Sequence, residues 1–94
     1  MRSHFIVHED PGHGWVAVKR DEINELGIGP AITPYSYQSW DGEACFLEED
    51  CDFATLYVAL KKRGIEMTWD HVHTDNEHWI RGLRSFSHRK AVAS

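Results

Sequence analysis

Several features that mark large classes of protein are missing from this sequence of 94 residues. No apolar run approaches the roughly 18–20 residues that a membrane-spanning helix needs, and the first residues lack the long apolar segment of a signal peptide. The two cysteines, Cys45 and Cys51, are too few for a disulfide framework or for a zinc site built from cysteine alone. We therefore expect a soluble cytoplasmic protein with reduced, structural cysteines and no membrane contact.

Lysine and arginine are missing from a long central stretch. None occurs from Asp21 to Leu60, although this stretch holds nine acidic residues. These are Asp21, Glu22, Glu25, Asp41, Glu43, Glu48, Glu49, Asp50 and Asp52. A helix N-terminus favours nearby negative charge, which accounts for the acids at 48–52 but not for the others. Solvated surfaces usually mix the two signs, so this segregation points to a positively charged partner.

Two kinds of partner for the acidic stretch can be excluded, calcium and nucleic acid. Calcium loops carry the spacing D-x-[DN]-x-[DN]-G, which residues 48–52 do not have. Direct nucleic-acid binding needs Lys and Arg to neutralise phosphates, and a net charge of −5 opposes it. A host protein or nucleoprotein complex with a basic groove is the best match for such a surface.

The chain has the size of one compact domain, residues 1–94. Its 41% hydrophobic and 12% aromatic content can supply a core without disulfides or metal. There are no internal repeats and no low-complexity segments. The polar and basic tail at 87–94 is expected to be frayed.

The first part of the chain predicts a β-hairpin and a short helix. Two apolar runs within 5–18 flank a turn at 9–14 that contains one proline and two glycines. Asp21 stands where an N-cap would, and Gly27 is a natural stop for a helix of about two turns at 21–26.

A second hairpin is predicted around Asp41-Gly42, since this dipeptide between β-rich runs is the strongest short-range hairpin signal. A two-residue loop fixes which residues face each other across the strands. The expected pairs are Trp40 with Glu43, Gln38 with Cys45 and Tyr37 with Phe46. Trp40 at the tip is not expected to be buried, and an exposed Trp beside acids is typical of an interface anchor.

The clearest pattern predicts a principal helix at about 51–63. Its apolar residues recur at helical spacing and should be buried on the sheet: Phe53, Leu56, Tyr57 and Leu60. Acids precede this helix, three basic residues end it, and Gly64 supplies the left-handed stop.

The last part of the chain predicts a strand and a further short helix. Alternation from Ile65 to His71 indicates a strand with one buried face. Residues 74–77 match a capping box, which predicts a helix near 75–83. The chain as a whole reads as α+β, a mostly antiparallel sheet of about four to five strands packed on the helix at 51–63.

The predicted partner-binding surface combines the hairpin tip with the start of the principal helix, which we expect to lie near one another. Its residues are Trp40, Asp41, Glu43, Glu48, Glu49, Asp50 and Asp52. A concentration of acids of this kind should steer a basic partner.

Two alternatives to protein binding remain open in the sequence. His71 and His73 share one face of a strand and precede His78, so a metal- or ligand-binding role is the second hypothesis. No spacing completes a zinc shell, and we expect no metal or cofactor. The third hypothesis is a hydrolase with His13 as base and Cys45 or Cys51 as nucleophile. Acids around Cys51 oppose its thiolate, so we expect no enzyme.

Three strings suggest a biological context. Residues 10–15, 35–37 and 47–52 read DPGHGW, YSY and LEEDCD, and with them the chain from 5 to 86 resembles small uncharacterised proteins of phages, plasmids and integrated mobile elements. The resemblance carries over no catalytic residue. It implies an inhibitor of host defence machinery, of which anti-CRISPR proteins are the best-known class. The sequence hypothesis is therefore a non-enzymatic inhibitor that acts in the host cytoplasm and blocks a basic nucleic-acid-recognition groove.

Overall fold

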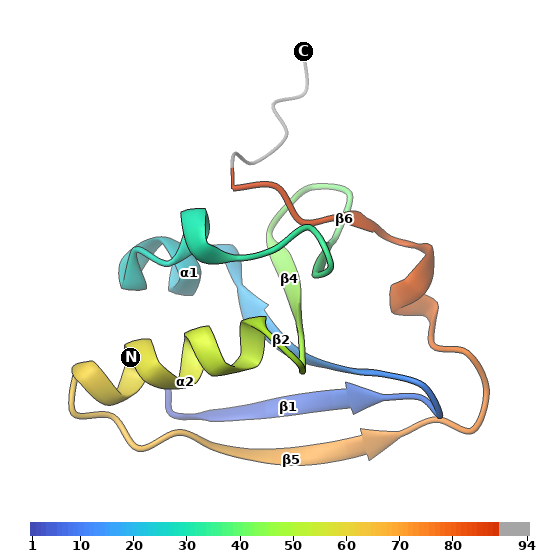
Figure 1. The fold of residues 1–94 in the computed structure, drawn as a ribbon, viewed down its shortest axis with the longest axis horizontal. Coiled ribbons are helices and arrows are strands. Elements are labelled where there is room, and N and C mark those ends of the chain that lie inside the picture. The colour runs from blue at the N-terminus through green and yellow to red at the C-terminus, as the bar shows by residue number, and fades with distance from the viewer. Residues whose placement is uncertain (89–94) are drawn as a thin grey trace.

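A single six-stranded sheet carries two α-helices on one side, as the computed structural model of residues 1–88 shows (Figure 1). The elements are β1 (His4–Glu9), β2 (Gly14–Lys19), α1 (Arg20–Leu26), the 3-10 turn η1 (Gly29–Ala31), β3 (Tyr37–Gln38), β4 (Ala44–Glu48), α2 (Asp52–Lys62), β5 (Thr68–His73), the 3-10 turn η2 (Trp79–Gly82) and β6 (Arg84–Ser85). The predicted α+β fold is confirmed.

The sheet is mostly antiparallel, as predicted. Its strand order is β5-β1-β2-β4-β3-β6, and only β1 and β5 run parallel. The sheet exceeds the expected four to five strands because β6, only two residues long, adds to β3.

The register of the second hairpin is confirmed. Tyr37 faces Phe46 and Gln38 faces Cys45. The loop is longer than predicted, because the amide of Gly42 donates to the carbonyl of Ser39 (2.9 Å) and the loop spans 40–43. A four-residue loop with the same centre keeps these two pairs, but the predicted pair of Trp40 with Glu43 was wrong, because both residues lie in the loop. Gly42 adopts the positive φ of 76° that the turn needs.

The main core lies between the sheet and the two helices. It contains Phe5, Val7, Val16, Val18, Ile23, Ile28, Ile32, Cys45, Leu47, Leu56, Leu60, Met67 and Phe86. From α2, Leu56 and Leu60 are fully buried and Phe53 is partly buried. The expectation for Tyr57 was wrong, since 38% of its surface is exposed. Tyr57 lies towards the edge of the sheet, where its ring contacts Trp69 (centroids 6.4 Å apart).

Replacing Leu56 with alanine should lower the free energy of unfolding by about 2–5 kcal/mol, because the lost methyl groups leave a cavity in the main core. Chemical denaturation measures this loss. Val58→Ala, on the exposed side of the same helix, is the control and should change stability by no more than about 0.5 kcal/mol. Equal stability of the two variants would contradict this position of the core.

A second, smaller core lies on the opposite face of the sheet. Trp15, Phe46 and Ile80 are buried there, and Tyr37 and Leu83 pack against them. Because β2 and β4 turn alternate side chains to the two faces, both faces bear apolar residues. The segment around η2 covers this face, because Ile80 and Leu83 pack over β2, β3 and β4.

Three local predictions need correction. The N-cap of α1 is Lys19 instead of Asp21, and the carboxylate of Glu22 accepts from the Lys19 amide (2.9 Å). The capping box at 74–77 does not form, since the Thr74 amide extends the β1–β5 pairing by donating to Glu9. The helical turn begins at Trp79 and is capped by His78, whose Nδ1 accepts from the Ile80 amide (3.1 Å).

The strand predicted from residue 65 also differs. It spans 68–73, at the edge of the sheet, and all six of its residues are exposed. Only Met67, just before it, is buried. Alternation identifies a strand, but it cannot show whether another element covers it.

The chain end is anchored further than predicted. The tail was expected to fray from residue 87, but the carbonyls of Ser87 and His88 accept from the guanidinium of Arg20 (2.8 and 3.2 Å). The rest of the predicted tail, 89–94, lies outside the described residues. Among residues 1–88, no helix is both long enough and apolar enough to cross a bilayer.

Candidate functional site

A solvent-open hollow of about 660 Å³ lies at the end of β4, where three loops and η2 meet. The loops are the β1–β2 turn, the segment before β3 and the segment between β4 and α2. The hollow is lined by His13, Trp15, Pro34, Tyr35, Tyr37, Glu48, Asp50, Cys51, Arg81 and Ser85. All three strings that carry the resemblance contribute residues to it.

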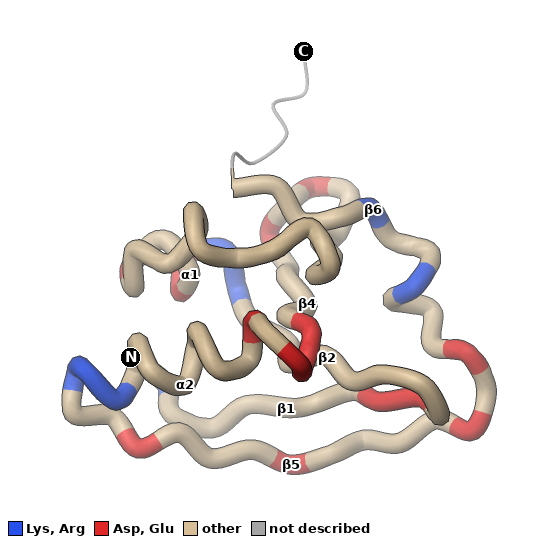
Figure 2. Tube along the Cα trace, viewed as in Figure 1, with Lys and Arg blue, Asp and Glu red and all other residues tan. Residues whose placement is uncertain are grey.

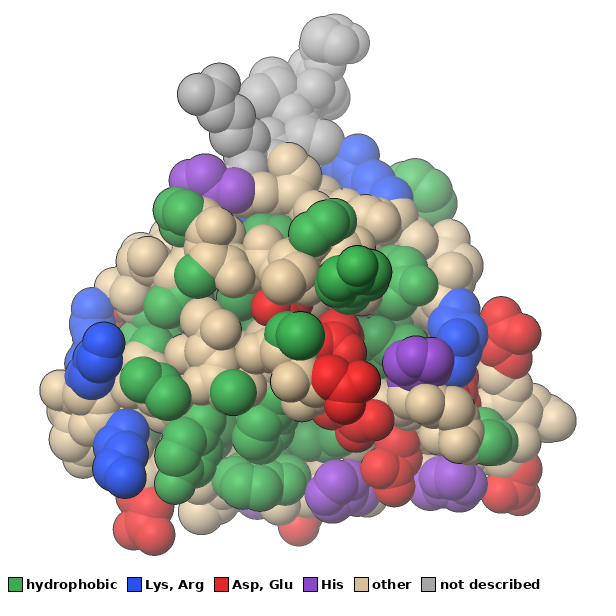
Figure 3. Space-filling view, viewed as in Figure 1, with side chains coloured by type: hydrophobic (Ala, Val, Ile, Leu, Met, Phe, Trp, Pro, Cys, Tyr) green, Lys and Arg blue, Asp and Glu red, His purple; other side chains and the backbone are tan. Residues whose placement is uncertain are grey.

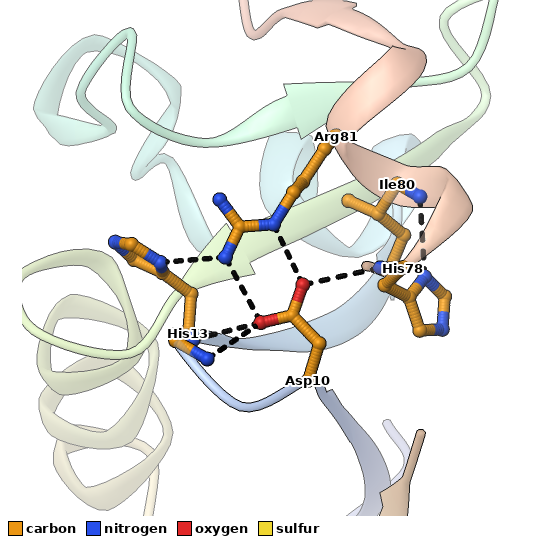
Figure 4. Close-up of polar contacts among 6 residues, drawn as sticks. Asp10, His13, His78, Ile80 and Arg81 are labelled. Atoms are coloured by element: carbon orange, nitrogen blue, oxygen red, sulfur yellow. Dashed lines mark hydrogen bonds and ion pairs between the residues drawn. The ribbon is translucent and has the colours of Figure 1, made fainter. Parts of the chain in front are cut away.

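Asp10 shapes the first wall of the hollow (Figure 4). One carboxylate oxygen, Oδ1, accepts from the amides of Gly12 (3.0 Å) and His13 (2.9 Å), which closes the turn. The other, Oδ2, accepts from the His78 amide (3.1 Å). The guanidinium of Arg81 donates to both oxygens, at 2.6 and 2.9 Å. The Arg81 guanidinium, followed by these amides, holds the pKa of Asp10 well below its usual range.

Arg81 links Asp10 to the rings of His13 and Trp15. Its Nη2 also donates to Nδ1 of His13 (2.9 Å), so the neutral His13 ring bears its proton on Nε2. The guanidinium lies 5.4 Å from the centre of the Trp15 ring, and His13 stacks on Trp15 at 6.0 Å. The charge of Arg81 is compensated by Asp10, and the wall it supports is largely aromatic.

Asp52 fixes the opposite wall. Its carboxylate is buried and accepts from the amide and hydroxyl of Thr33 and from the hydroxyl of Ser36. Ser36 in turn accepts from the Glu48 amide (2.9 Å). These bonds tie the 33–36 segment to α2 and β4, and they hold Tyr35 at the hollow with 72% of its surface exposed.

Glu48 organises the start of α2 from within the hollow. Only 7% of its surface is exposed, and its carboxylate accepts from the amides of Asp50 (3.2 Å) and Cys51 (2.6 Å). Cys51 is the N-cap residue of α2 and gives no side-chain cap. Glu48 therefore supplies acceptors in the turn that leads into the helix.

Two exposed carboxylates border the hollow. Asp50 lines it, and the Glu49 carboxylate covers Gly14, where an added Cβ would lie 2.7 Å from Oε2. Neither forms an ion pair with Lys or Arg in residues 1–88. Figure 3 shows acidic side chains gathered at the centre of this face, with a histidine and a basic side chain beside them. The rim of the hollow is thus negative and not neutralised.

The predicted partner-binding surface is divided by the structure. Glu48 and Asp52 are buried and bonded internally, so they are not available at a surface. The expectation that the hairpin tip lies near the helix start was wrong. The five residues of β4 separate them by about 16 Å, and Figure 2 shows acids at both ends of this strand.

The hairpin tip forms its own surface. Trp40 is exposed as expected, at 68%, and Asp41 and Glu43 are exposed beside it. The guanidinium of Arg84 lies 5.8 Å from the centre of the Trp40 ring and donates to the Trp40 carbonyl (2.7 Å). A basic residue therefore already occupies part of the tip.

The cysteine hypothesis meets a physical obstacle. His13 and Cys51 do line the same hollow, whereas Cys45 is buried within the main core. Burial raises the pKa of Cys45 to about 11. Partial desolvation, with the carboxylates of Glu48, Asp52 and Asp50, raises the pKa of Cys51. Neither thiol is activated as a nucleophile by its surroundings.

The histidines of the metal hypothesis do not form one group. His71 and His73 both contact Glu9, through Nδ1 at 3.1 and 3.8 Å. His78 is buried against Trp15 and Trp79 on the other face. In the described part of the chain, no three His, Cys, Asp or Glu side chains are arranged to hold a metal ion.

We expect the purified protein to contain no stoichiometric zinc, because the strand pair of His71 and His73 offers no closed ligand shell. Elemental analysis and melting curves with and without a chelator test this. Zinc at one atom per chain, lost together with stability on chelation, would revive the metal hypothesis.

Asp10 and Arg81 were missed as site residues. The signal for Asp10 was present, since Asp followed by Pro-Gly is typical of a turn that an Asx side chain closes. Nothing in the sequence indicates that Arg81, 71 positions away, pairs with it.

No family model matches the chain, and neither a curated protein nor a solved structure matches it.

Proposed function

We propose that this protein is a non-enzymatic binding protein, whose hollow and negative rim receive a lysine or arginine side chain of a basic partner protein. The observation that carries the proposal is the exposed carboxylate pair of Glu49 and Asp50 beside an aromatic hollow, neither of which forms an ion pair with Lys or Arg within residues 1–88. Acids without internal partners keep their full potential for an incoming cation.

The lining suits a cationic side chain on two grounds. Aromatic faces attract ammonium and guanidinium groups, and Tyr35 and Tyr37 line the hollow. Asp50 adds an exposed carboxylate acceptor, and Arg81, the one Lys or Arg among the described residues that line the hollow, is compensated by Asp10. Largely exposed Tyr35 resembles the aromatic anchors of protein interfaces.

The partner we propose is the basic groove of a host complex that recognises nucleic acid. A negative rim competes for the same Lys and Arg side chains that neutralise phosphates. This agrees with the mobile-element context that the sequence resemblance implies, and it predicts binding that weakens with salt and is displaced by nucleic acid. The raised pKa of Cys51 favours binding over thiol catalysis at this hollow.

Titration with acetyl-arginine amide, followed by NMR of the isotope-labelled protein, tests the hollow directly. We expect concentration-dependent shifts at the Trp15 indole, the His13 ring and the Tyr35 amide. Acetyl-citrulline amide is the matched control, because it keeps the shape of arginine without its charge. It should cause shifts at least about fivefold smaller at equal concentration, since the carboxylates then meet no cation.

Two outcomes would contradict the proposal. Equal shifts with both compounds would show that charge plays no part. Arginine-specific shifts confined to the hairpin tip at Asp41 would move the binding surface there.

A further inference from the structure

β5 presents an open sheet edge. It lies at the end of the strand order and pairs with β1 along its whole length, and no strand in residues 1–88 covers its other side. All six residues from Thr68 to His73 are exposed. The edge is visible as the lowest strand in Figure 1.

The backbone groups on this edge can be assigned. The amides of Thr68 and Thr74 donate to Ser3 and Glu9 on the β1 side. Successive residues of a strand turn their N–H and C=O groups to opposite sides, so even-numbered residues face β1. Trp69, His71 and His73 therefore direct their N–H and C=O groups outward, as an unpaired template for another strand.

Natural sheets usually protect such edges with lysine, proline, bulges or very short strands. The opposite edge of this sheet follows that rule, because β6 is only two residues long. β5 has six residues and contains neither lysine nor proline, and it exposes Trp69 and Val72. The β6 edge is therefore too short to pair with a further strand, whereas the β5 edge can do so.

We propose that β5 is a strand-addition site that takes an extended basic segment of a partner protein. The negative charge along β5 favours a basic segment over a neutral or acidic one. From Gly64 to Ile80 the chain has no Lys or Arg, while four exposed acids lie along or beside the strand: Glu66, Asp70, Asp75 and Glu77. This proposal depends on the proposed function in one respect only, which is that the partner is basic. The β5 edge is a separate surface, since no residue of β5 lines the hollow.

A second copy of this chain fits the edge less well. A two-fold axis between antiparallel β5 strands must pass through a residue that then faces itself. Centred on Asp70, the pairing opposes two carboxylates, and centred on His71 it sets each Asp70 opposite Val72. Either register brings together two segments of the same negative charge.

The test uses one position and two substitutions. His71→Pro removes an outward N–H while leaving the β1 bonds, and proline is tolerated where a strand N–H faces solvent. His71→Ala removes the same side chain, including its contact with Glu9, but keeps the N–H. Comparison of the two isolates the backbone contribution.

The probe is an acetylated, amidated octapeptide of alternating lysine and valine, with a glutamate–valine peptide as charge control. We expect the lysine peptide to bind the parent and His71→Ala within about threefold, and His71→Pro at least about tenfold more weakly, which corresponds to ~1.4 kcal/mol. The glutamate peptide should bind the parent at least about tenfold more weakly. Amide exchange at Trp69, His71 and His73 should slow on binding.

A backbone N-methylated lysine–valine peptide gives the same test without changing the protein, and should not bind. Equal binding of the lysine peptide to His71→Pro and the parent, or equal binding of both charge types, would overturn the proposal. So would a parent dimer that His71→Pro converts to a monomer in sedimentation. His71→Pro should still bind acetyl-arginine amide, so failure at this edge is distinguishable from failure at the hollow.

Discussion

Replacing Arg20 with methionine is expected to remove about 4–5 kcal/mol from the free energy of unfolding. This is much of the roughly 5–14 kcal/mol that a domain of this size possesses. Arg20 is buried, with 3% of its surface exposed, and no carboxylate neutralises it in an ion pair within residues 1–88.

Neutral oxygens take the place of a counter-ion around Arg20. The guanidinium donates to the Gly42 carbonyl (2.9 Å), to the Gln38 side chain (2.8 Å) and to the carbonyls of Ser87 and His88. It also lies 4.7 Å from the centre of the Phe86 ring. Methionine would leave these acceptors without their donor, so α1, the hairpin loop and the chain end would lose their common anchor.

Chemical denaturation of Arg20→Met and Arg2→Met measures the effect. Arg2 is the control, because it is exposed and its pair with Glu22 (2.8 Å) should contribute no more than about 1 kcal/mol. Similar losses in the two variants would show that Arg20 does not anchor residues 87–88 to the domain.

Replacing Asp52 with alanine should cost about 3–5 kcal/mol. The substitution leaves the Thr33 amide and the hydroxyls of Thr33 and Ser36 without their buried acceptor. It should also release the segment that holds Tyr35 at the hollow. We therefore expect binding of basic ligands to weaken even at temperatures where the variant is fully folded.

Asp50→Ala separates these two effects. Asp50 is exposed two residues earlier, before α2 begins, so its loss should change stability by no more than about 0.5 kcal/mol while weakening binding. Thermal unfolding and acetyl-arginine amide titration are measured on both variants. An Asp52→Ala protein as stable as Asp50→Ala would contradict the structural role of the buried carboxylate.

The elements that sequence patterns predicted well are those governed by local rules. The stripe of α2 and its left-handed Gly64 follow from helix geometry, and the Asp41-Gly42 signal correctly sets the hairpin register. The exposure of Tyr57 and β5 depends on where an element lies over the sheet, which periodicity does not encode.

The site was harder to predict because it depends on buried polar groups. Acids in a sequence are read as surface charge, but Glu48 and Asp52 are buried where amides and hydroxyls bond to them. His13 was considered only as a candidate base, and Tyr35 only as part of the YSY string at 35–37. Their meeting at one hollow depends on Asp10 and Arg81, which are distant in sequence.

The central claim is that Glu49 and Asp50 form the surface that receives a basic partner. Glu49→Lys with Asp50→Lys reverses that rim, and Asp21→Lys with Glu25→Lys makes the same charge change on the exposed side of α1. Both pairs shift the net charge of −5 equally, so any difference between them reflects position.

Calorimetric titration with an acetylated, amidated octapeptide of alternating glycine and arginine, at low and high salt, is the most direct measurement. The Glu49/Asp50 pair should bind at least about tenfold more weakly than the Asp21/Glu25 pair at low salt, and the difference should shrink at high salt. Equal affinities of the two pairs at both salt concentrations would contradict the account.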